Sequence, residues 1–337
     1  MPNMISKALA LPALITLSMS LPAQAQSDVE LGGYGEMHYN NLADGTRKLD
    51  FHRFVLFFGH EWNDSTRFFS ELEIEHALAG ESQPGEVELE QAYVEIDLND
   101  KLSTQSGVFL LPIGILNETH EPDTFYGVER NPVEKNIIPT TWWEGGFGIN
   151  GRAGMATSYS LHVHSGLLVD PTSFNIRSGR QKVANANTGS LAYTASMSWR
   201  GVPGMEIGAA LQMQDDITQG ASPTPASLTE FHIDMEKGSF GLRALYAGWQ
   251  LNSAAARALN KDQQSGYYLE PSYKFSKKFG IFARMNSWDN SSGTATNTQM
   301  DYGINYWPHP KVAFKFDVQD HSDDTKDGFN LGVGYQF

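Results

Sequence analysis

The last ten residues of the chain, GFNLGVGYQF from Gly328 to Phe337, decide the fold. Every second residue is apolar, and the residues between them are polar or small: Phe329, Leu331, Val333, Tyr335 and Phe337 alternate with Asn330, Gly332, Gly334 and Gln336. Successive side chains of a β-strand point to opposite faces, so this segment predicts a strand with one wholly apolar face.

The same alternation recurs upstream, over residues 67–75, 190–199, 205–214, 267–275, 300–306 and 312–318. A helical period is nowhere as well supported. In a soluble sandwich, such strands would turn their apolar faces inward. Two features favour a membrane instead: tight and long connections alternate, and aromatic residues gather beside the tight ones, as at a membrane interface. These aromatic residues are Trp62, Trp199, Phe275, Phe279 and Tyr306.

The tight connections predict how many strands there are. They read NDS at Asn63, NDK at Asn99, GRAG at Gly151, GVPG at Gly201, EKGS at Glu236, SKK at Ser276 and WPHPK at Trp307. Pairing strands across each of them predicts an all-β fold, a transmembrane antiparallel β-barrel of about 16 strands with both termini at the tight-turn end. A closed barrel satisfies every backbone hydrogen-bonding group without water.

Composition alone would have suggested an acidic soluble protein, because the net charge is -15. In a barrel only every second residue of a strand must be apolar, so the average hydropathy of the chain does not reveal the apolar stripes that face the lipid. The absence of cysteine excludes disulfides and thiol chemistry. Residues 1–25 carry an apolar run followed by Ala23-Gln24-Ala25, which predicts a cleaved signal peptide and leaves residues 26–337 as the barrel.

One connection is far longer than an ordinary loop of about 4 to 6 residues. It contains NETHEPDTFYGVERNPVEKNIIPTTWWEGG, from Asn117 to Gly146, and it is the third long loop. Its prolines and aromatic residues favour an ordered loop folded into the lumen over a mobile outer flap. Its charged residues are our candidates for the pore constriction: Glu118, Glu121, Asp123, Glu129, Arg130, Glu134 and Lys135.

A second set of candidates lies on the predicted inward faces of the strands. These pore-wall residues are Arg53, Arg67, Glu71, Glu73, Glu75, Arg243, Lys274, Arg284 and Lys315. A negative loop opposite a positive wall would place a transverse electric field across the aperture, which favours polar solutes. The alternative is that the same charges pair with one another only to hold the loop.

The signal peptide, the paired strands, the long third loop and the terminal Phe337 resemble the Gram-negative outer-membrane porins. The passage GVFLLPIGI from Gly107, with the loop after it, is most similar to the family of phosphate-selective porins O and P. This resemblance implies a homotrimer in the outer-membrane lipid, with the third loop narrowing each barrel. It also implies anion transport through lumenal arginines, whereas the carboxylate-rich inward faces here argue against phosphate selectivity.

The sequence therefore predicts a porin that lets small hydrophilic solutes or ions diffuse through a water-filled pore, with a mild cation preference. The alternatives are an anion or phosphate channel and, from another class, a barrel-borne hydrolase that uses His162 or His164. Those two histidines alternate with Leu161 and Val163 on one strand, so they fall on its polar face in any case. We expect no enzymatic activity, cofactor, metal or nucleic-acid partner.

Overall fold

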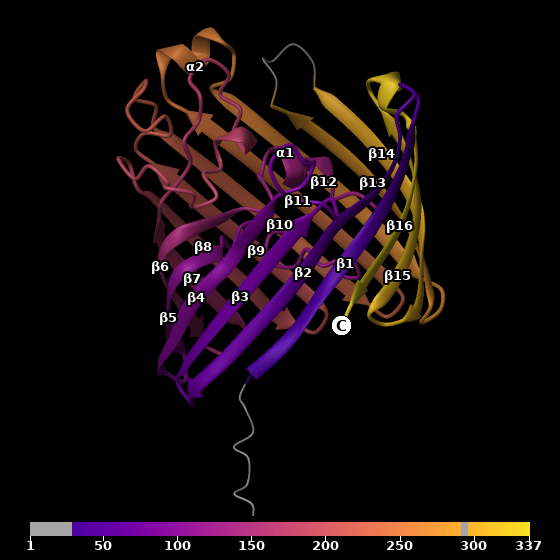
Figure 1. The fold of residues 1–337 in the computed structure, drawn as a ribbon, viewed down its shortest axis with the longest axis horizontal. Coiled ribbons are helices and arrows are strands. Elements are labelled where there is room, and N and C mark those ends of the chain that lie inside the picture. Colours follow the sequence, from indigo (N-terminus) through magenta and orange to yellow (C-terminus); the bar gives the residue numbers. More distant parts are fainter. Residues whose placement is uncertain (1–28, 291–295) are drawn as a thin grey trace, which may run out of the picture.

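The structure, a computed structural model, describes residues 29–290 and 296–337. The predicted signal peptide lies outside these ranges. The described chain forms one closed barrel in which each strand pairs with its neighbours in sequence and β1 pairs with β16 (Figure 1). The strands are β1 (Val29–Leu42), β2 (Arg47–Asn63), β3 (Thr66–Glu75), β4 (Val87–Asn99), β5 (Leu102–Leu110), β6 (Trp143–Ala153), β7 (Thr157–His164), β8 (Ala192–Val202), β9 (Met205–Gln214), β10 (Ala226–Lys237), β11 (Phe240–Leu251), β12 (Gln263–Lys274), β13 (Phe279–Asp289), β14 (Asn297–His309), β15 (Val312–His321) and β16 (Gly328–Gln336).

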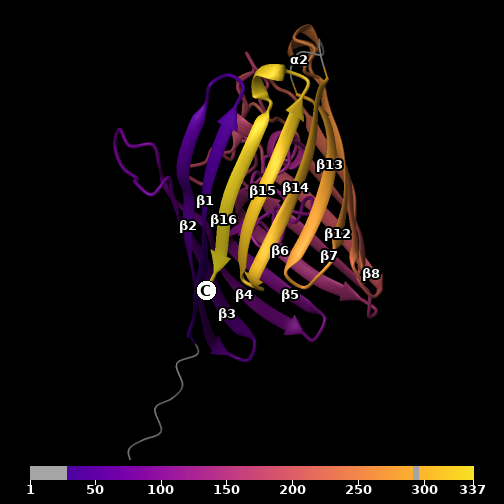
Figure 2. The same ribbon diagram turned by 90° about the vertical axis from the view of Figure 1, so that its right-hand side faces the viewer.

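All the pairings are antiparallel, and the C-terminal strand β16 closes the barrel by pairing with β1. Tyr34 of β1 lies opposite Gln336 of β16, and Leu42 lies opposite Gly328. The strand count of 16 and the positions of the tight turns confirm the prediction from the sequence. The C-terminus lies at the tight-turn end (Figure 2), where the backbones of Gly33 and Phe337 also exchange hydrogen bonds.

The predicted apolar stripes face outward. On β12, Tyr267, Leu269 and Tyr273 are exposed, whereas Tyr268 and Glu270 are buried inside the barrel. The aromatic residues near the tight turns form part of an outer rim, in which the ring of Phe279 stacks 4.6 Å from that of Tyr306. No helix in the described part of the chain is long and apolar enough to cross a membrane.

Long loops occupy the other end of the barrel. Loop 3, residues 111–142 between β5 and β6, contains the short helix α1 (Pro132–Asn136); loop 4, residues 165–191, lies between β7 and β8; and α2 (Ala254–Ala258) lies between β11 and β12. Gly107 lies in β5, shortly before the chain enters loop 3. Its φ of +134° suits glycine, and a Cβ there would lie 2.3 Å from the carbonyl oxygen of Ala92.

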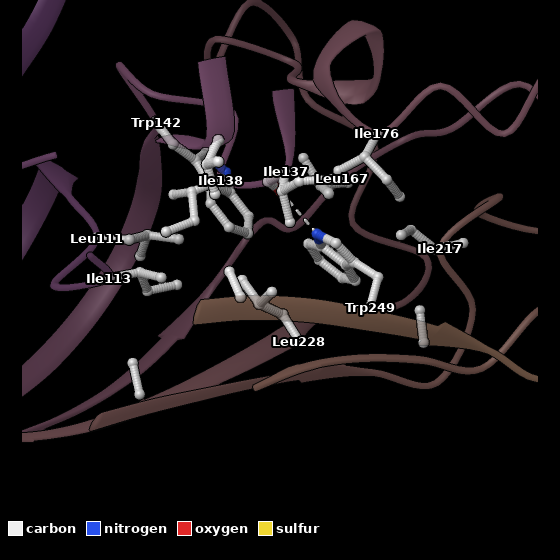
Figure 3. Close-up of a cluster of buried hydrophobic side chains, with 14 of the residues drawn as sticks. Leu111, Ile113, Ile137, Ile138, Trp142, Leu167, Ile176, Ile217, Leu228 and Trp249 are labelled. Carbon is white, nitrogen blue, oxygen red and sulfur yellow. Dashed lines mark hydrogen bonds between the residues drawn. The ribbon is translucent and has the colours of Figure 1, made fainter. Parts of the chain in front are cut away.

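The barrel has an apolar core inside it, on the side of β9 to β12 (Figure 3). Trp142 of loop 3 and Trp249 of β11 are almost fully buried, with their ring centroids 6.1 Å apart. Around them pack side chains from loops 3 and 4 and from the wall: Leu111, Ile113, Ile137, Ile138, Leu167, Val169, Phe174, Ile176, Leu228 and Leu245. Each fully buried Leu or Ile contributes about 1.5 to 3 kcal/mol, so this core fixes the loops firmly.

Candidate functional site: the charged slot beside loop 3

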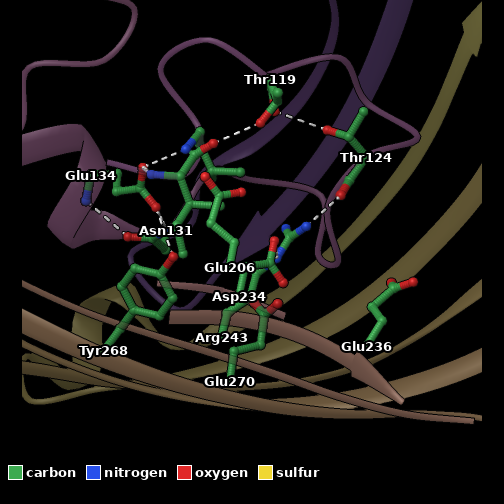
Figure 4. A network of polar contacts seen from close by, with 12 residues as sticks. Thr119, Thr124, Asn131, Glu134, Glu206, Asp234, Glu236, Arg243, Tyr268 and Glu270 are labelled. Carbon is green, nitrogen blue, oxygen red and sulfur yellow. Dashed lines mark hydrogen bonds and ion pairs between the residues drawn. The ribbon is translucent and has the colours of Figure 1, made fainter. Parts of the chain in front are cut away.

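Loop 3 is held inside the barrel by bonds to inward-pointing side chains of the wall. Trp249 donates its indole N–H to the carbonyl oxygen of Ile137 at 2.9 Å. Tyr268 of β12 donates its hydroxyl to Glu134 at 2.7 Å (Figure 4). Both wall residues are buried, so each hydrogen bond forms away from bulk water. A buried donor left without a partner would cost free energy, so these bonds favour the lodged position of the loop.

Glu134 is the internal anchor of the loop and does not line open space. One of its carboxylate oxygens accepts the backbone N–H groups of Ile115, at 3.0 Å, and Leu116, at 2.6 Å. The other accepts from Tyr268 and from the side chain of Asn131, which also caps α1. Burial raises the pKa of Glu134, although these hydrogen bonds oppose that shift.

Three predicted wall cations bind the backbone of loop 3. Arg243 donates to the carbonyl oxygen of Thr124 at 3.1 Å, and Arg284 donates to that of Tyr126 at 3.4 Å. Lys315 donates to that of Gly127 at 2.8 Å. Arg284 is also paired with Glu270 and Asp301 of the wall. These cations therefore tether the loop, which differs from the predicted arrangement in which they face its carboxylates across a gap.

On the opposite side of the loop, a cavity of about 100 Å³ lies against β1 to β4. We call this cavity the charged slot. Its carboxylates come mainly from the wall, and its cations come mainly from loops 3 and 4. The acidic residues are Glu36, Glu73, Glu75, Glu88, Glu90 and Glu129, and the basic ones are Arg53, Arg130, Lys135, Arg177, Arg180 and Lys182. The polarity is thus the reverse of the predicted one, with a mainly negative wall facing mainly positive loops.

Ion pairs hold the wall side of the slot. Arg53 lies 2.7 Å from Glu36 and 3.6 Å from Glu73. His38 connects this group to the loop, since its ring nitrogens lie 3.0 Å from Glu36 and 3.1 Å from Glu129. Burial alone would raise the pKa of Glu129, but the hydrogen bond and positive charge of His38, together with Lys135 and His52, outweigh burial and lower that pKa.

Burial lowers the pKa of several cations on the loop side of the slot. Burial, reinforced by Arg180 and Arg130, lowers the pKa of Arg177 to about 9, and burial also lowers the pKa of Lys135. Arg177 donates to the carbonyl oxygens of Lys135, at 2.9 Å, and Thr140, at 2.6 Å, so it joins loop 4 to loop 3. Arg130 bonds Thr141 at 2.6 Å, while its Nε and Nη2 atoms are buried without a hydrogen-bond partner.

Towards the tight-turn end, the lumen widens into a second cavity of about 420 Å³ between loop 3 and β7 to β11. Its charged lining is Glu118, Glu206, Asp234, Arg200 and Arg243. Glu118 is exposed to this lumenal space. Enclosure within the barrel, together with the carboxylate of Glu206, raises the pKa of Glu118 to about 7.

The remaining candidates from the sequence lie apart from the slot or beside it. Arg67 pairs with Asp97 at 2.7 Å near the tight turns, and half-exposed Lys274 lies 3.3 Å from Glu236. Asp123 accepts from Gln336 at 2.7 Å, and Glu121 is half-buried. Glu71 is buried and accepts from Gln91 at 2.7 Å.

The two histidines of the hydrolase alternative have neutral partners. His162 lies 3.2 Å from the side-chain oxygen of Asn150, and His164 lies 2.9 Å from the hydroxyl of Thr194. Ser165 bonds Glu144 instead of either histidine. Among the described residues, neither histidine therefore belongs to a nucleophile, base and acid arrangement.

Sequence reasoning missed Glu36, His38, Glu88, Glu90 and His120, together with the cations of loop 4. The carboxylates had a detectable signal, because Glu86, Glu88 and Glu90 alternate in GEVELEQ, as inward-facing residues of a strand do. Loop 4 gave no such signal, since an irregular segment has no period that would indicate its direction.

Comparison with known proteins supports this fold. No family model matches the chain. An uncharacterised protein of Aquifex aeolicus (strain VF5) is 30% identical over 355 residues, covering 90% of this chain and 78% of that protein.

Solved structures of outer-membrane proteins share the fold, as three examples show. An anion-selective porin from Comamonas acidovorans has a TM-score of 0.66 at 12% identity, covering 93% of this chain and 100% of that one. OmpF of Salmonella typhi, in complex with daunomycin, has a TM-score of 0.65 at 14% identity, covering 92% and 98%. OmpT, an outer-membrane protein of Vibrio cholerae, in trimer form, has a TM-score of 0.63 at 10% identity, covering 92% and 99%. At these identities, the likeness establishes a shared fold.

Proposed function

This chain belongs to the same family as the uncharacterised Aquifex protein, and we propose that it is an outer-membrane porin. In this proposal, small hydrophilic solutes or ions diffuse passively through the barrel, without covalent chemistry or energy coupling. The observation that carries the proposal is a closed, outwardly apolar barrel whose interior contains cavities lined by charged side chains. Such an interior suits water and ions, because unpaired charges are strongly disfavoured without them.

The apolar core directs the proposed path. It occupies the space between loop 3 and β9 to β12, so a solute that enters from the long-loop end passes through the charged slot. From there it reaches the wider cavity beside Glu118 and then the tight-turn end. Loop 3 is the constriction in this proposal. Opposite charges on the two sides of the slot orient polar solutes and disfavour apolar ones.

The charges along this path favour a mild cation preference. Acidic side chains equal lysines and arginines in the slot, and exceed them by one in the cavity beside Glu118. A further cavity lies at the tight-turn end, where its lining includes Asp64 and Asp97. There too, acidic side chains exceed lysines and arginines by one. A small excess of carboxylates raises the local concentration of cations.

Anion or phosphate selectivity is the second candidate. It is favoured by the cations around the slot, and especially by Arg130, whose two unpartnered nitrogen atoms could donate to an anion. Planar-bilayer recording under a tenfold KCl gradient would separate the two. Our proposal predicts a small reversal potential of the cation-selective sign, and a clear potential of the anion-selective sign would contradict it.

Charge variants would test whether the slot lies on the path. Glu129→Gln should shift the reversal potential towards anions, and Arg130→Gln should shift it towards cations. Ser106→Ala, an exposed change outside the slot, is the matched control. Potentials that stay unchanged in both charge variants would remove the slot from the path, and an absence of conductance in the folded wild type would refute the porin.

We also propose that the barrel assembles as a homotrimer, as OmpT of Vibrio cholerae does in its trimer form. Native mass spectrometry of the detergent-folded protein would test this. A uniformly monomeric protein would contradict it.

A further inference from the structure

A buried cluster joins loop 3 to the barrel wall at His120, the only histidine of the loop. Its Nε2 atom lies 3.6 Å from Oε1 of Glu71 on β3 and 3.5 Å from Oε2 of Glu90 on β4. The three residues are 2%, 2% and 1% exposed in that order, so bulk water does not reach them. The cluster therefore brings two carboxylates and one imidazole together in the buried interior of the barrel.

Two atoms of this cluster have no hydrogen-bond partner. Nε2 of His120 and Oε2 of Glu90 are both buried and, although they lie 3.5 Å apart, neither atom makes a hydrogen bond. The other ring nitrogen, Nδ1, lies 3.1 Å from the carbonyl oxygen of Asn117 and donates its proton there. In this tautomer Nε2 carries a lone pair, unless a second proton is added to the ring. The lone pair faces two carboxylates, which also carry lone pairs, so the three groups repel one another. A cation bound between Nε2 and the two carboxylates would turn this repulsion into attraction.

The distances fit a metal ion. Zinc binds histidine nitrogen and carboxylate oxygen at about 2.0 to 2.2 Å, so tetrahedral ligands lie roughly 3.3 to 3.6 Å apart. The two separations from Nε2 are 3.5 and 3.6 Å. One ligand atom from each of the three residues lies within 4.8 Å of the others.

The surroundings also match those of metal ligands. A ligating histidine usually donates its other N–H to a carbonyl or carboxylate, and ligating carboxylates are themselves hydrogen-bonded. Asn117 serves His120 in this way, and Gln91 donates to the second oxygen of Glu71 at 2.7 Å.

We propose that Glu71, Glu90 and His120 form a binding site for a divalent transition-metal ion, with Zn²⁺ as the ion to test first. The imidazole ligand favours such ions over Ca²⁺ and Mg²⁺, which prefer oxygen ligands alone. Because His120 belongs to loop 3 and the carboxylates belong to the wall, the ion cross-links the two. It thereby sets the position of the loop beside the slot.

Two other arrangements make different predictions. A second proton on Nε2 would fill the same space as a simple ion pair and would leave no tight zinc site. A rival cluster, Asp50 with His52 and His76, also has ligand atoms within 4.8 Å, but its members are half-buried and bonded to one another. His120→Ala and His76→Ala therefore form a matched pair that separates the two clusters.

The experiment uses the full-length barrel, folded in detergent and stripped of metal with EDTA. ZnCl₂ alone is titrated in competition with a chromogenic chelator, with CaCl₂ as the comparison ion. Wild type and His76→Ala should each bind one tight zinc ion. His120→Ala and Glu90→Gln should lose at least about 100-fold in affinity, the upper end of what even second-shell losses cost.

Heat-modifiable migration on gels shows whether each variant is folded, and His120→Gln replaces His120→Ala if the latter is not. X-ray absorption at the zinc edge should show a shell of nitrogen and oxygen near 2.0 to 2.2 Å with one imidazole.

Three results would overturn the site: no tight zinc in folded wild type, wild-type affinity in the His120 variant, or loss of binding in His76→Ala alone. These readouts do not depend on conduction, so the metal site and the porin proposal can fail separately.

Discussion

The anchoring of loop 3 by Glu134 yields the sharpest prediction. Glu134→Ala removes the acceptor for two backbone N–H groups, those of Ile115 and Leu116, and for the hydroxyl of Tyr268. Leaving a buried donor unpaired costs about 1 to 3 kcal/mol. We therefore expect local opening of the loop to become easier by about 3 kcal/mol, which corresponds to a rise of roughly 100-fold in the opening equilibrium.

Hydrogen exchange measures this opening directly, because protected amides exchange only when a segment opens. Peptides that cover residues 113–120 should lose roughly 100-fold in protection in folded Glu134→Ala, while β13 to β15 stay unchanged. Glu118→Ala is the control, because that side chain is exposed within the same loop. A loss of less than tenfold in Glu134→Ala, or an equal loss in the control, would refute the assignment of Glu134 as the anchor.

Three further predictions concern the pore and the wall. Since the pKa of Glu118 is raised to about 7, its carboxyl is largely neutral at pH 6 and charged at pH 8. Cation preference should therefore grow between these pH values, and Glu118→Gln should reduce that growth in bilayer recordings. Gly107→Ala should lower the folded fraction on heat-modifiability gels, because its Cβ would clash with the carbonyl oxygen of Ala92, whereas neighbouring Ser106→Ala should not. Leu269→Arg, in the middle of a lipid-facing stripe, should lower the free energy of unfolding by about 2 to 4 kcal/mol, measured by urea unfolding from lipid vesicles. Phe275→Arg, at the rim, should lower it by only about 0 to 1 kcal/mol. Equal costs would contradict the placement of Leu269 at the centre of the membrane.

The sequence sufficed for the barrel because one rule governs every strand. Alternation at Phe329, Leu331 and Val333 defines the lipid-facing side, and the tight turns then set the pairing. The direction of Glu71 and Glu73 followed from the same rule, and both are buried within the barrel.

The candidate site was harder to predict because it depends on contacts between loops. Nothing local in the sequence indicates that Arg177, in loop 4, binds the carbonyl oxygen of Thr140, in loop 3. The charge of Glu134 suggested a pore-lining role, whereas its position over two backbone amides makes it an anchor. Charge is visible in a sequence, but the neighbours that determine its use are brought together only by the fold.

The apolar core inside the barrel has a consequence for temperature. Ordinary diffusion through a water-filled pore slows on cooling as water becomes more viscous. Hydrophobic association also weakens on cooling, and loops 3 and 4 are packed around Trp142 and Trp249 largely by such contacts. Cold would therefore loosen the packing that narrows this lumen. In the porin that we propose, the viscous resistance of water and the tightness of the constriction therefore change in opposite directions with temperature.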